Sequence, residues 1–459
     1  MTALSSKRKQ RSLIIGVMLS ILTYWLFAQA LLNIGPQIQS TYHASLNIVN
    51  ISVSLTSFVT GVLMVVAGNV ADKLGRVKMI YLALILNVLG SLLLVLTSYI
   101  GLFLLGRVVQ GFSAAIIMPT TIALFNDYFD GEARKKALSY WSIGAFGGTG
   151  FASTFAGLIS TYLGWQYIFI LSIVISIVAF WLLRDISDTQ RQRDTSAHFD
   201  LVGLVIFIAM IASISFVITQ GYKMGWTHPY SLGCLLIFVV SMGLFLFVEQ
   251  RRVEPFINLR LFKNKAFVGA VIANTLLNTC VGVIALINIF AQGSLKLNSF
   301  QAGLLTLPYV IALLIVVRVG EKGINRFGSK VMMVGGPTLS AIGIALLSMT
   351  FLSSSSYLVL VIIASVLFGT GTGLFATPAL NTAVSTTPQD KVGVASGIFK
   401  MGSTLGGAFG IAIITSVYEG VLSSGKSVSQ AASYGFLTGV LMVVIAIIVG
   451  GCLLPRKEN

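Results

Sequence analysis

The chain has 459 residues, of which 56% are hydrophobic and only 10% are charged. Soluble globular domains carry about 25% charged residues, so this composition, with a mean hydropathy of +0.92, excludes an ordinary soluble protein. The net charge of +16 suggests nucleic acid as one partner to consider, but the basic residues are scattered through short polar segments and do not gather in one patch.

Long apolar runs separated by short polar segments predict an all-α integral membrane protein with fourteen transmembrane helices. Each run is close to the roughly 20 residues that a helix needs to cross a bilayer. The short connections require neighbouring helices to be antiparallel. In chain order the predicted spans are 13–35, 48–70, 79–98, 100–125, 137–160, 166–184, 200–220, 231–249, 267–290, 301–319, 331–351, 357–380, 396–418 and 435–454.

The distribution of basic residues predicts the orientation of these helices. An even number of spans puts both termini on one side of the membrane, and cytoplasmic segments are enriched in Lys and Arg. With both termini in the cytoplasm, the segments on that side contain 24 of the 30 Lys and Arg residues, and the outer loops contain three. We therefore expect cytoplasmic termini and a lipid bilayer, not nucleic acid, as the partner of this basic chain.

Two longer polar connections, 184–200 and 249–265, divide the chain into six helices, two extra helices and six helices. A similar segment follows the second helix of each group of six: Asp72-Lys-Leu-Gly75-Arg76-Val-Lys78 and Asn325-Arg-Phe-Gly328-Ser-Lys330. This repetition favours two six-helix bundles. The predicted N-terminal bundle is residues 13–184, and the predicted C-terminal bundle is residues 267–454. Between them, residues 185–266 form a linker with two extra helices. Residues 1–12 and 455–459 are the predicted cytoplasmic N-terminus and cytoplasmic tail.

The segment from Gly68 to Lys78 is the strongest motif in the chain. Gly75 permits a tight turn between two helices, and Asp72, Arg76 and Lys78 can pair with one another or with helix ends at the cytoplasmic face. Such pairs would form a latch that breaks when the two halves of the molecule move. The alternative is a solvated turn that carries only the charge of a cytoplasmic loop.

The full spacing of this motif resembles the loop signature of the major facilitator superfamily. Residues 105–111 (LGRVVQG) resemble its intramembrane arginine motif, and residues 144–150 (GAFGGTG) stand at the position of its antiporter glycine motif, with Thr149 where proline is usual. Three further segments resemble the fourteen-span, QacA-like group of drug:proton antiporters: residues 164–169, 369–373 and 396–410.

Within that group the chain is most similar to bacterial quinolone-efflux proteins, through residues 24–29 (YWLFAQ), 137–144 (ALSYWSIG) and 318–322 (RVGEK). The resemblance runs from about residue 13 to residue 454. It implies a proton-coupled multidrug antiporter of the bacterial cell membrane that exports amphipathic drugs, including fluoroquinolones, by alternating access. It further implies that the protein needs no cofactor and functions as a monomer.

Ionisable residues within the predicted spans are few. None of the fourteen acidic residues lies in the middle of a span, whereas QacA-like exporters of cationic dyes usually have an aspartate in span 1, so the proton carrier is not identified. Arg107 lies within span 4, and the family motif implies that it tunes proton movement; alternatively it ties helices together through backbone carbonyls. Lys400 in span 13 either attracts the carboxylate of a drug or extends to the membrane surface.

Polar and aromatic stripes predict a path for the substrate. Trp25, Gln29 and Asn33 share one face of span 1, and Asn274 and Asn278 share a face of span 9 with Asn288 and Gln292. Asn and Gln also join helices by hydrogen bonds, which is the alternative role. Aromatic surface for flat drugs would come from Trp25, Phe27, Trp141 and Phe146.

Other functions are less compatible with the sequence. Cys234, Cys280 and Cys452 lie in apolar runs without the spacing of a metal site or a disulfide framework, and no phosphate-binding GxxxxGK[ST] loop is present. A polytopic membrane enzyme would need acidic or nucleophilic residues that converge at one membrane face. The main rival is a transporter of the same fold for an endogenous lipid-like or anionic metabolite.

Overall fold

The computed structural model describes residues 7–129, 131–187, 200–252, 255, 257, 259–387 and 392–454. All regular secondary structure within these ranges is helical. Among the described residues, thirteen helical segments are long and apolar enough to cross a membrane, which confirms the all-α, multi-span class. The predicted span 137–160 lies within the 32-residue helix Gly131–Tyr162, which is not one of these thirteen segments. The count of fourteen spans and the cytoplasmic position of the termini stay predictions.

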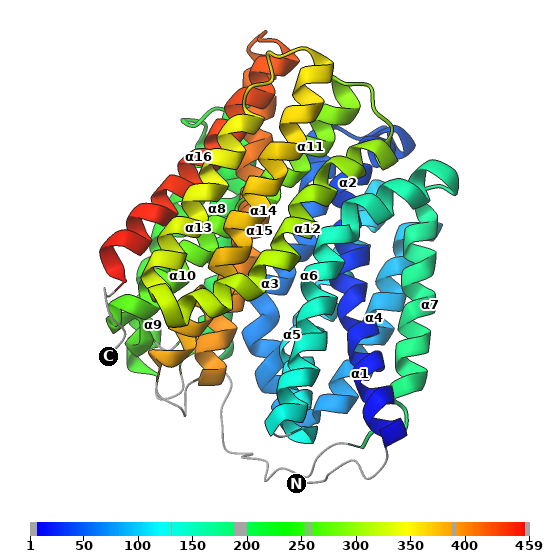
Figure 1. Ribbon diagram of the computed structural model, residues 1–459, viewed down its shortest axis with the longest axis vertical. Coiled ribbons are helices and arrows are strands. Elements are labelled where there is room, and N and C mark those ends of the chain that lie inside the picture. Colours follow the sequence, from blue (N-terminus) through cyan, green and yellow to red (C-terminus); the bar gives the residue numbers. More distant parts are fainter. Residues whose placement is uncertain are drawn as a thin grey trace. The chain divides into compact units, whose positions relative to one another are not determined.

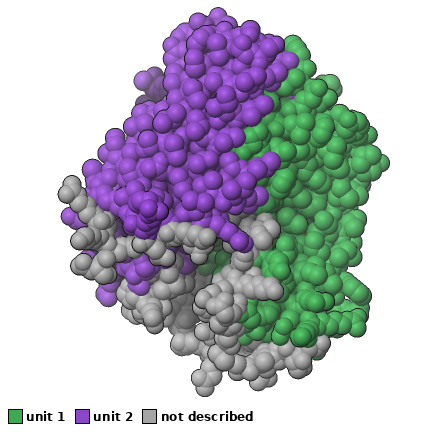
Figure 2. Space-filling model, in the orientation of Figure 1, with its two compact units in different colours: residues 1–195, 296–310 green, residues 196–295, 311–459 purple. Residues whose placement is uncertain are grey.

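The described chain divides into two compact units (Figure 2), namely residues 1–195 with 296–310, and residues 196–295 with 311–459. The predicted boundaries of the bundles and the linker stay predictions. The helices of unit 1 (Figure 1) are α1 Lys7–Leu22, η1 Thr23–Phe27, η2 Ala28–Ala30, α2 Leu31–Tyr42, α3 Leu46–Leu74, α4 Arg76–Leu96, α5 Ile100–Tyr128, α6 Gly131–Tyr162 and α7 Gln166–Leu183.

Unit 2 contains the helices that correspond to the predicted extra pair and to most of the second group of six. Helix α12, Ser299–Phe327, begins in the residues assigned to unit 1 and ends in unit 2. The other elements are α8 Leu201–Met224, α9 Pro229–Arg251, η3 Leu259–Lys263, α10 Lys265–Asn278, α11 Val281–Gly293, α13 Ser329–Leu347, α14 Ser354–Ser385, α15 Val392–Ser423 and α16 Val428–Leu453.

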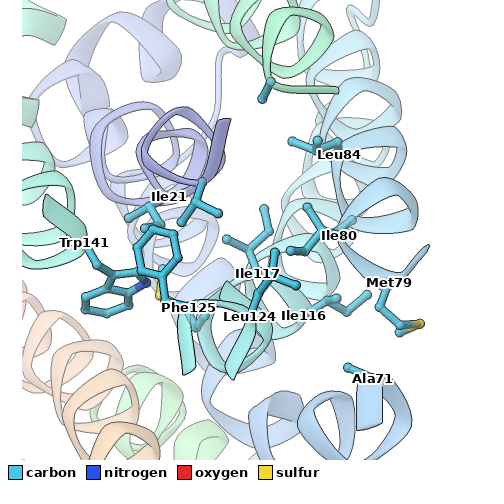
Figure 3. Close-up of a cluster of buried hydrophobic side chains, with 14 of the residues drawn as sticks. Ile21, Ala71, Met79, Ile80, Leu84, Ile116, Ile117, Leu124, Phe125 and Trp141 are labelled. Carbon is cyan, nitrogen blue, oxygen red and sulfur yellow. The ribbon is translucent and has the colours of Figure 1, made fainter. Parts of the chain in front are cut away.

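The core of unit 1 is a cluster of buried apolar side chains from the interrupted first helix and from α3, α4, α5, α6 and α7. Figure 3 shows Ile21 of α1, Ile80 of α4, and Ile117 and Phe125 of α5 in this cluster, with Trp141 of α6 beside Phe125. In a bilayer, helix association depends on close van der Waals packing because lipid is as apolar as the side chains. This cluster therefore fixes the positions of the helices that carry the polar groups described below.

Two of the predicted spans are interrupted helices. In the first, a π-helix (η1) and a 3-10 helix (η2) separate α1 from α2. In the second, α10 ends at Asn278 and α11 begins at Val281. Apolar periodicity predicted each as one continuous helix, because an interruption of the hydrogen-bond ladder leaves composition unchanged.

Close packing in unit 1 also depends on glycine in α6. A Cβ added at Gly148 would lie 2.9 Å from the Cβ of Trp25 and 3.3 Å from the backbone nitrogen of Leu26, whereas one added at Gly147 would meet nothing within 4 Å. Gly147 and Gly148 are adjacent in α6, but only Gly148 faces η1.

We predict that Gly148→Ala lowers the apparent unfolding temperature of the purified protein in detergent, because overpacking typically costs about 1–3 kcal/mol. Gly147→Ala is the control, and the helix propensity of alanine, about 1 kcal/mol better than that of glycine, should leave that variant at least as stable as the parent. Equal unfolding temperatures for the two variants would contradict the packing of η1 on α6.

Candidate functional site

Among the described residues of unit 1, Arg107 in α5 is the most deeply buried cation, with only 1% of the residue exposed. Its Nε donates to the carbonyl oxygen of Ser52 at 2.9 Å, its Nη1 to Oε1 of Gln110 at 2.7 Å, and its Nη2 to the carbonyl oxygen of Ala28 at 3.0 Å. No described carboxylate forms an ion pair with it. The charge is therefore solvated by neutral oxygens from three parts of the chain.

The hydrogen-bond acceptors of Arg107 lie in three helical elements, and the arginine joins these elements. Ser52 lies in α3, Gln110 in α5 one turn from Arg107, and Ala28 is the first residue of the 3-10 segment η2. The first helix changes from π to 3-10 hydrogen bonding at Ala28. Arg107 donates to the carbonyl oxygen of this residue, so the buried arginine contacts the first helix at its interruption.

Neutral side chains extend this network on both sides. Nε2 of Gln110 donates to Oγ of Ser91 at 3.1 Å, and Oγ1 of Thr56 donates to the carbonyl of Arg107 itself at 3.0 Å. Beside it, the hydroxyl of Tyr24 and Nε2 of Gln29 both donate to Oγ of Ser57 at 3.2 Å.

These contacts position two sequence candidates of span 1. Gln29 is 7% exposed and bound to Ser57. Trp25 is only partly buried and packs edge-on against Tyr24 with ring centroids 4.8 Å apart. Its buried Nε1 has no hydrogen-bond partner among the residues that the structure describes. The sequence motifs include Arg107 but neither Ser52 nor Ser57, since a serine in an apolar helix carries no sequence signal of its own.

Asn33, the third member of the predicted stripe, joins helices within unit 1. It is fully buried, and its Nδ2 donates to the carbonyl oxygens of Ser153 at 2.6 Å and Ser299 at 3.1 Å. Gln37, one turn later in α2, donates to Oγ of Ser299. Asn33 therefore ties helices together by hydrogen bonds, which is the alternative role considered for the Asn and Gln residues of the stripe.

The aromatic candidates of α6 differ in their surroundings. Trp141 is 5% exposed and lies in the apolar cluster of Figure 3, where its Nε1 donates to Oγ1 of Thr121 at 2.9 Å. Its position is that of a core residue with a satisfied polar atom. The backbone of Phe146 lies in α6, but its side chain lies outside the described residues.

The candidates of unit 2 lie where α10 meets α15. Nδ2 of Asn274 donates to the carbonyl of Phe399 at 2.9 Å and to Oγ of Ser403 at 2.7 Å, and Nδ2 of Asn278 donates back to the carbonyl of Asn274 at 2.8 Å. Lys400, between the two residues that Asn274 contacts, is half-buried. The structure thus brings Asn274, Asn278 and Lys400 to one helix pair.

The predicted latch lies between α3 and α4. Gly75 has a φ of 111°, a conformation that favours glycine, and its N–H closes α3 on the carbonyl of Ala71 at 3.0 Å. The Cβ position of Gly68 is 3.4 Å from Pro119 of α5. Lys78 is exposed, and the side chain of Asp72 lies outside the described residues.

Arg76 of this motif forms an ion pair that the sequence did not identify. Its Nη1 lies 2.6 Å from Oδ2 of Asp127 at the end of α5 and donates to the carbonyl of Ala123 at 2.9 Å. The side chains of Arg76 and Asp127 are 12% and 11% exposed. The signal that could have found this partner is positional: Asp127 ends a span on the same predicted membrane face as the motif.

In the part of the chain that the structure describes, no three His, Cys, Asp or Glu side chains converge as a metal site would require. The polar groups around Arg107, Asn274 and Asn278 are amides, hydroxyls and backbone carbonyls. Such groups can bind a small molecule by hydrogen bonds.

Comparison with known proteins gives consistent results. A family model described as Major Facilitator Superfamily matches residues 13–410 and, separately, residues 266–459. The chain is 41% identical over 447 residues to the quinolone resistance protein NorB of Staphylococcus aureus strain MRSA252, covering 97% of this chain and 96% of that protein. The same protein from strain COL is 40% identical over 447 residues, with the same coverage of each chain.

Solved structures with low sequence identity share the fold. A D-xylose-proton symporter superposes with a TM-score of 0.71 at 12% identity, covering 98% of this chain and 99% of that one. An auto-inhibited peptide transporter of the POT family superposes with a TM-score of 0.68 at 16% identity, covering 98% of each chain.

We predict that Arg107→Lys destabilises the protein although it keeps the charge, because a single ammonium group cannot reach the separate acceptors that the planar guanidinium joins. Each buried acceptor left unpaired costs about 1–3 kcal/mol, which should appear as a lower unfolding temperature in detergent. Arg318→Lys, at an exposed position of α12, is the matched control and should change little. An unchanged unfolding temperature for Arg107→Lys would contradict the importance of these contacts.

Proposed function

Because this chain belongs to the major facilitator superfamily, we propose that it is a proton-coupled multidrug efflux antiporter that exports amphipathic drugs, including fluoroquinolones, by alternating access. The observation that carries the proposal is the identity of 41% to a quinolone resistance protein over 97% of the chain. The family makes the protein a transporter and not an enzyme, and its apolar helices make it a multi-pass protein of the bacterial cell membrane.

The basic side chains within the spans support a preference for drugs that carry a carboxylate over drugs that are permanently cationic. Arg107 is a buried cation without an ion-pair partner among the described residues, and Lys400 adds a second basic side chain in α15. A permanently cationic drug gains nothing from either group. A zwitterion with a carboxylate, the chemistry of a fluoroquinolone, gains attraction that is strong in a medium of low dielectric constant.

Separate roles follow for the candidate residues. Arg107 tunes proton movement, since its positive charge repels an incoming proton. Lys400 attracts the carboxylate of the drug. Trp25 and Gln29, on the same helix as the interruption, contribute aromatic and hydrogen-bonding surface. Asn33, Trp141 and Asn274 act mainly through the helices that they hold; Asn278 and Phe146 complete the set of cavity candidates.

The latch remains part of the proposal. Gly75 fixes the turn, Gly68 allows α3 to approach α5, and the pair of Arg76 and Asp127 ties the start of α4 to the end of α5. Asp72 and Lys78 complete the set of charges that such a latch would break and re-form. The protein needs no cofactor for this cycle, because the proton gradient supplies the energy, and one copy of the chain contains both units.

The experiment that tests the function is transport into everted membrane vesicles. We expect vesicles that contain the protein to accumulate a radiolabelled fluoroquinolone when their lumen is acidified, and to release it when an uncoupler collapses the pH gradient. Vesicles without the protein are the control. Accumulation that the uncoupler leaves unchanged would contradict proton coupling, and accumulation equal to that of the control would contradict drug export.

Lys400→Gln should separate drug classes in the same assay. Removal of the charge is expected to reduce uptake of a zwitterionic fluoroquinolone at least about fivefold, equivalent to about 1 kcal/mol of lost interaction, while uptake of a quaternary ammonium dye, if detectable, is unchanged or increased. Lys400→Arg, which keeps the charge, should retain most of the fluoroquinolone uptake. Equal losses for both drug classes would argue against a direct contact with the carboxylate.

A further inference from the structure

Asn278, the last residue of α10, has a side-chain oxygen that the described part of the protein does not use. Its Nδ2 donates to the backbone carbonyl oxygen of Asn274 at 2.8 Å and to Oδ1 of the same residue at 3.0 Å. Its own Oδ1 accepts no hydrogen bond from any described residue, and the residue is partly exposed. This oxygen is therefore available to a bound molecule.

Acceptors on α15 fix the orientation of the neighbouring amide. Nδ2 of Asn274 lies 2.9 Å from the carbonyl oxygen of Phe399 and 2.7 Å from Oγ of Ser403. The hydroxyl of Ser403 donates to the same carbonyl at 3.2 Å, so both atoms act as acceptors toward Asn274. Because a backbone carbonyl can only accept, the amide of Asn274 presents its nitrogen to α15 and leaves its oxygen for Asn278.

The same argument fixes the amide of Asn278. It faces two acceptors, the backbone carbonyl and the Oδ1 of Asn274, and both N–H hydrogens of an amide are on one nitrogen. The opposite orientation would place oxygen against oxygen, with no hydrogen bond between them. Both hydrogens are thus used within the protein, and the remaining group is an oxygen that can only accept.

The series of amides makes this terminal oxygen a better acceptor. Hydrogen bonds in series polarise one another in a medium of low dielectric constant, and this series runs from α15 through Asn274 to Asn278. Hydrogen bonds from a positively charged donor are about twice as strong as those from a neutral one. The chemistry favoured at Oδ1 of Asn278 is therefore that of a protonated amine.

A neutral acceptor also suits the composition of this helix pair. Lys400 directly follows Phe399, whose carbonyl begins the series of amides. A carboxylate in the place of Asn278 would attract the lysine as well as an amine, whereas an amide oxygen carries no net charge. Helices α10 and α15 can therefore offer separate partners to the two charges of one zwitterion.

We propose that Oδ1 of Asn278 accepts a hydrogen bond from the protonated amine of a zwitterionic substrate, and that Asn274 positions this oxygen. The assignment rests on the proposed function, because it names the group of the drug that Asn278 recognises, but binding can be measured without transport. The carboxylate of a fluoroquinolone is then attracted to Lys400 and its amine to Asn278. A drug without a basic amine loses only the second contact.

Binding to the purified protein in detergent tests the assignment with two matched compounds: a fluoroquinolone with a free secondary amine, and the same drug with that amine acetylated. We expect acetylation to weaken binding to the parent at least about fivefold, but to change binding to Asn278→Leu by less than about twofold. Leucine has the branched shape of asparagine and forms no hydrogen bonds. Because each protein is compared with itself, the size of the acetyl group cancels.

Thr275→Val, about one turn earlier in α10, is the matched control. The hydroxyl of Thr275 bonds to the carbonyl oxygen of Val271 within the same helix at 2.8 Å, so its removal should leave the full difference between the two compounds. If Asn278→Leu does not fold, Asn278→Thr replaces it, since a threonine hydroxyl can bond to the carbonyl four residues earlier but lacks the amide oxygen.

An equal effect of acetylation on the parent and on the Asn278 variant would overturn the assignment. A parent that binds the two compounds equally, or binds neither, would also overturn it. Uptake into everted vesicles separates this result from the proposed function. A protein that prefers the free amine in binding but accumulates no drug would contradict only the proposed function, whereas proton-driven uptake without that preference would contradict only the assignment.

Discussion

The burial of one guanidinium group constrains the organisation of unit 1. A charge within a membrane span is stable only when the protein replaces the water that it loses, and Arg107 does so with the carbonyls of Ser52 and Ala28 and the amide of Gln110. The contact with Ala28 lies where the first helix changes from π to 3-10 geometry, and the contact with Ser52 joins α5 to α3. The buried arginine therefore links the interrupted first helix and α3 to α5.

The sequence predicted the features that depend on local composition. The hydropathy of each run located the helices, and the glycine of the loop motif predicted a turn at Gly75, which has a φ of 111°. The interruptions near residue 28 and at 279–280 were not predicted, because backbone hydrogen bonding can shift without any change in apolar pattern. The pairing of Arg76 with Asp127 was also missed, since it depends on how the ends of α4 and α5 meet.

Amide side chains show a second limit of sequence patterns. Asn33 and Asn274 were predicted to line a path, and the structure shows each of them donating to backbone carbonyls of other helices. A residue that lines a cavity and one that joins two helices both face away from lipid, so they share the same periodicity. Trp141 illustrates the same ambiguity for aromatic residues, because burial in an apolar core and contact with a flat drug favour the same side chain.

The neutral character of the first span has a consequence for selectivity. Where cation exporters of this group usually have an aspartate, Tyr24 and Gln29 both donate to Ser57, and no carboxylate pairs with Arg107 among the described residues. Hydroxyls and amides can satisfy one another without a net charge, whereas a carboxylate placed here would be drawn to the arginine and neutralised by it. In the function proposed here, the buried charge of Arg107 disfavours a permanent cation more than a molecule that carries its own carboxylate.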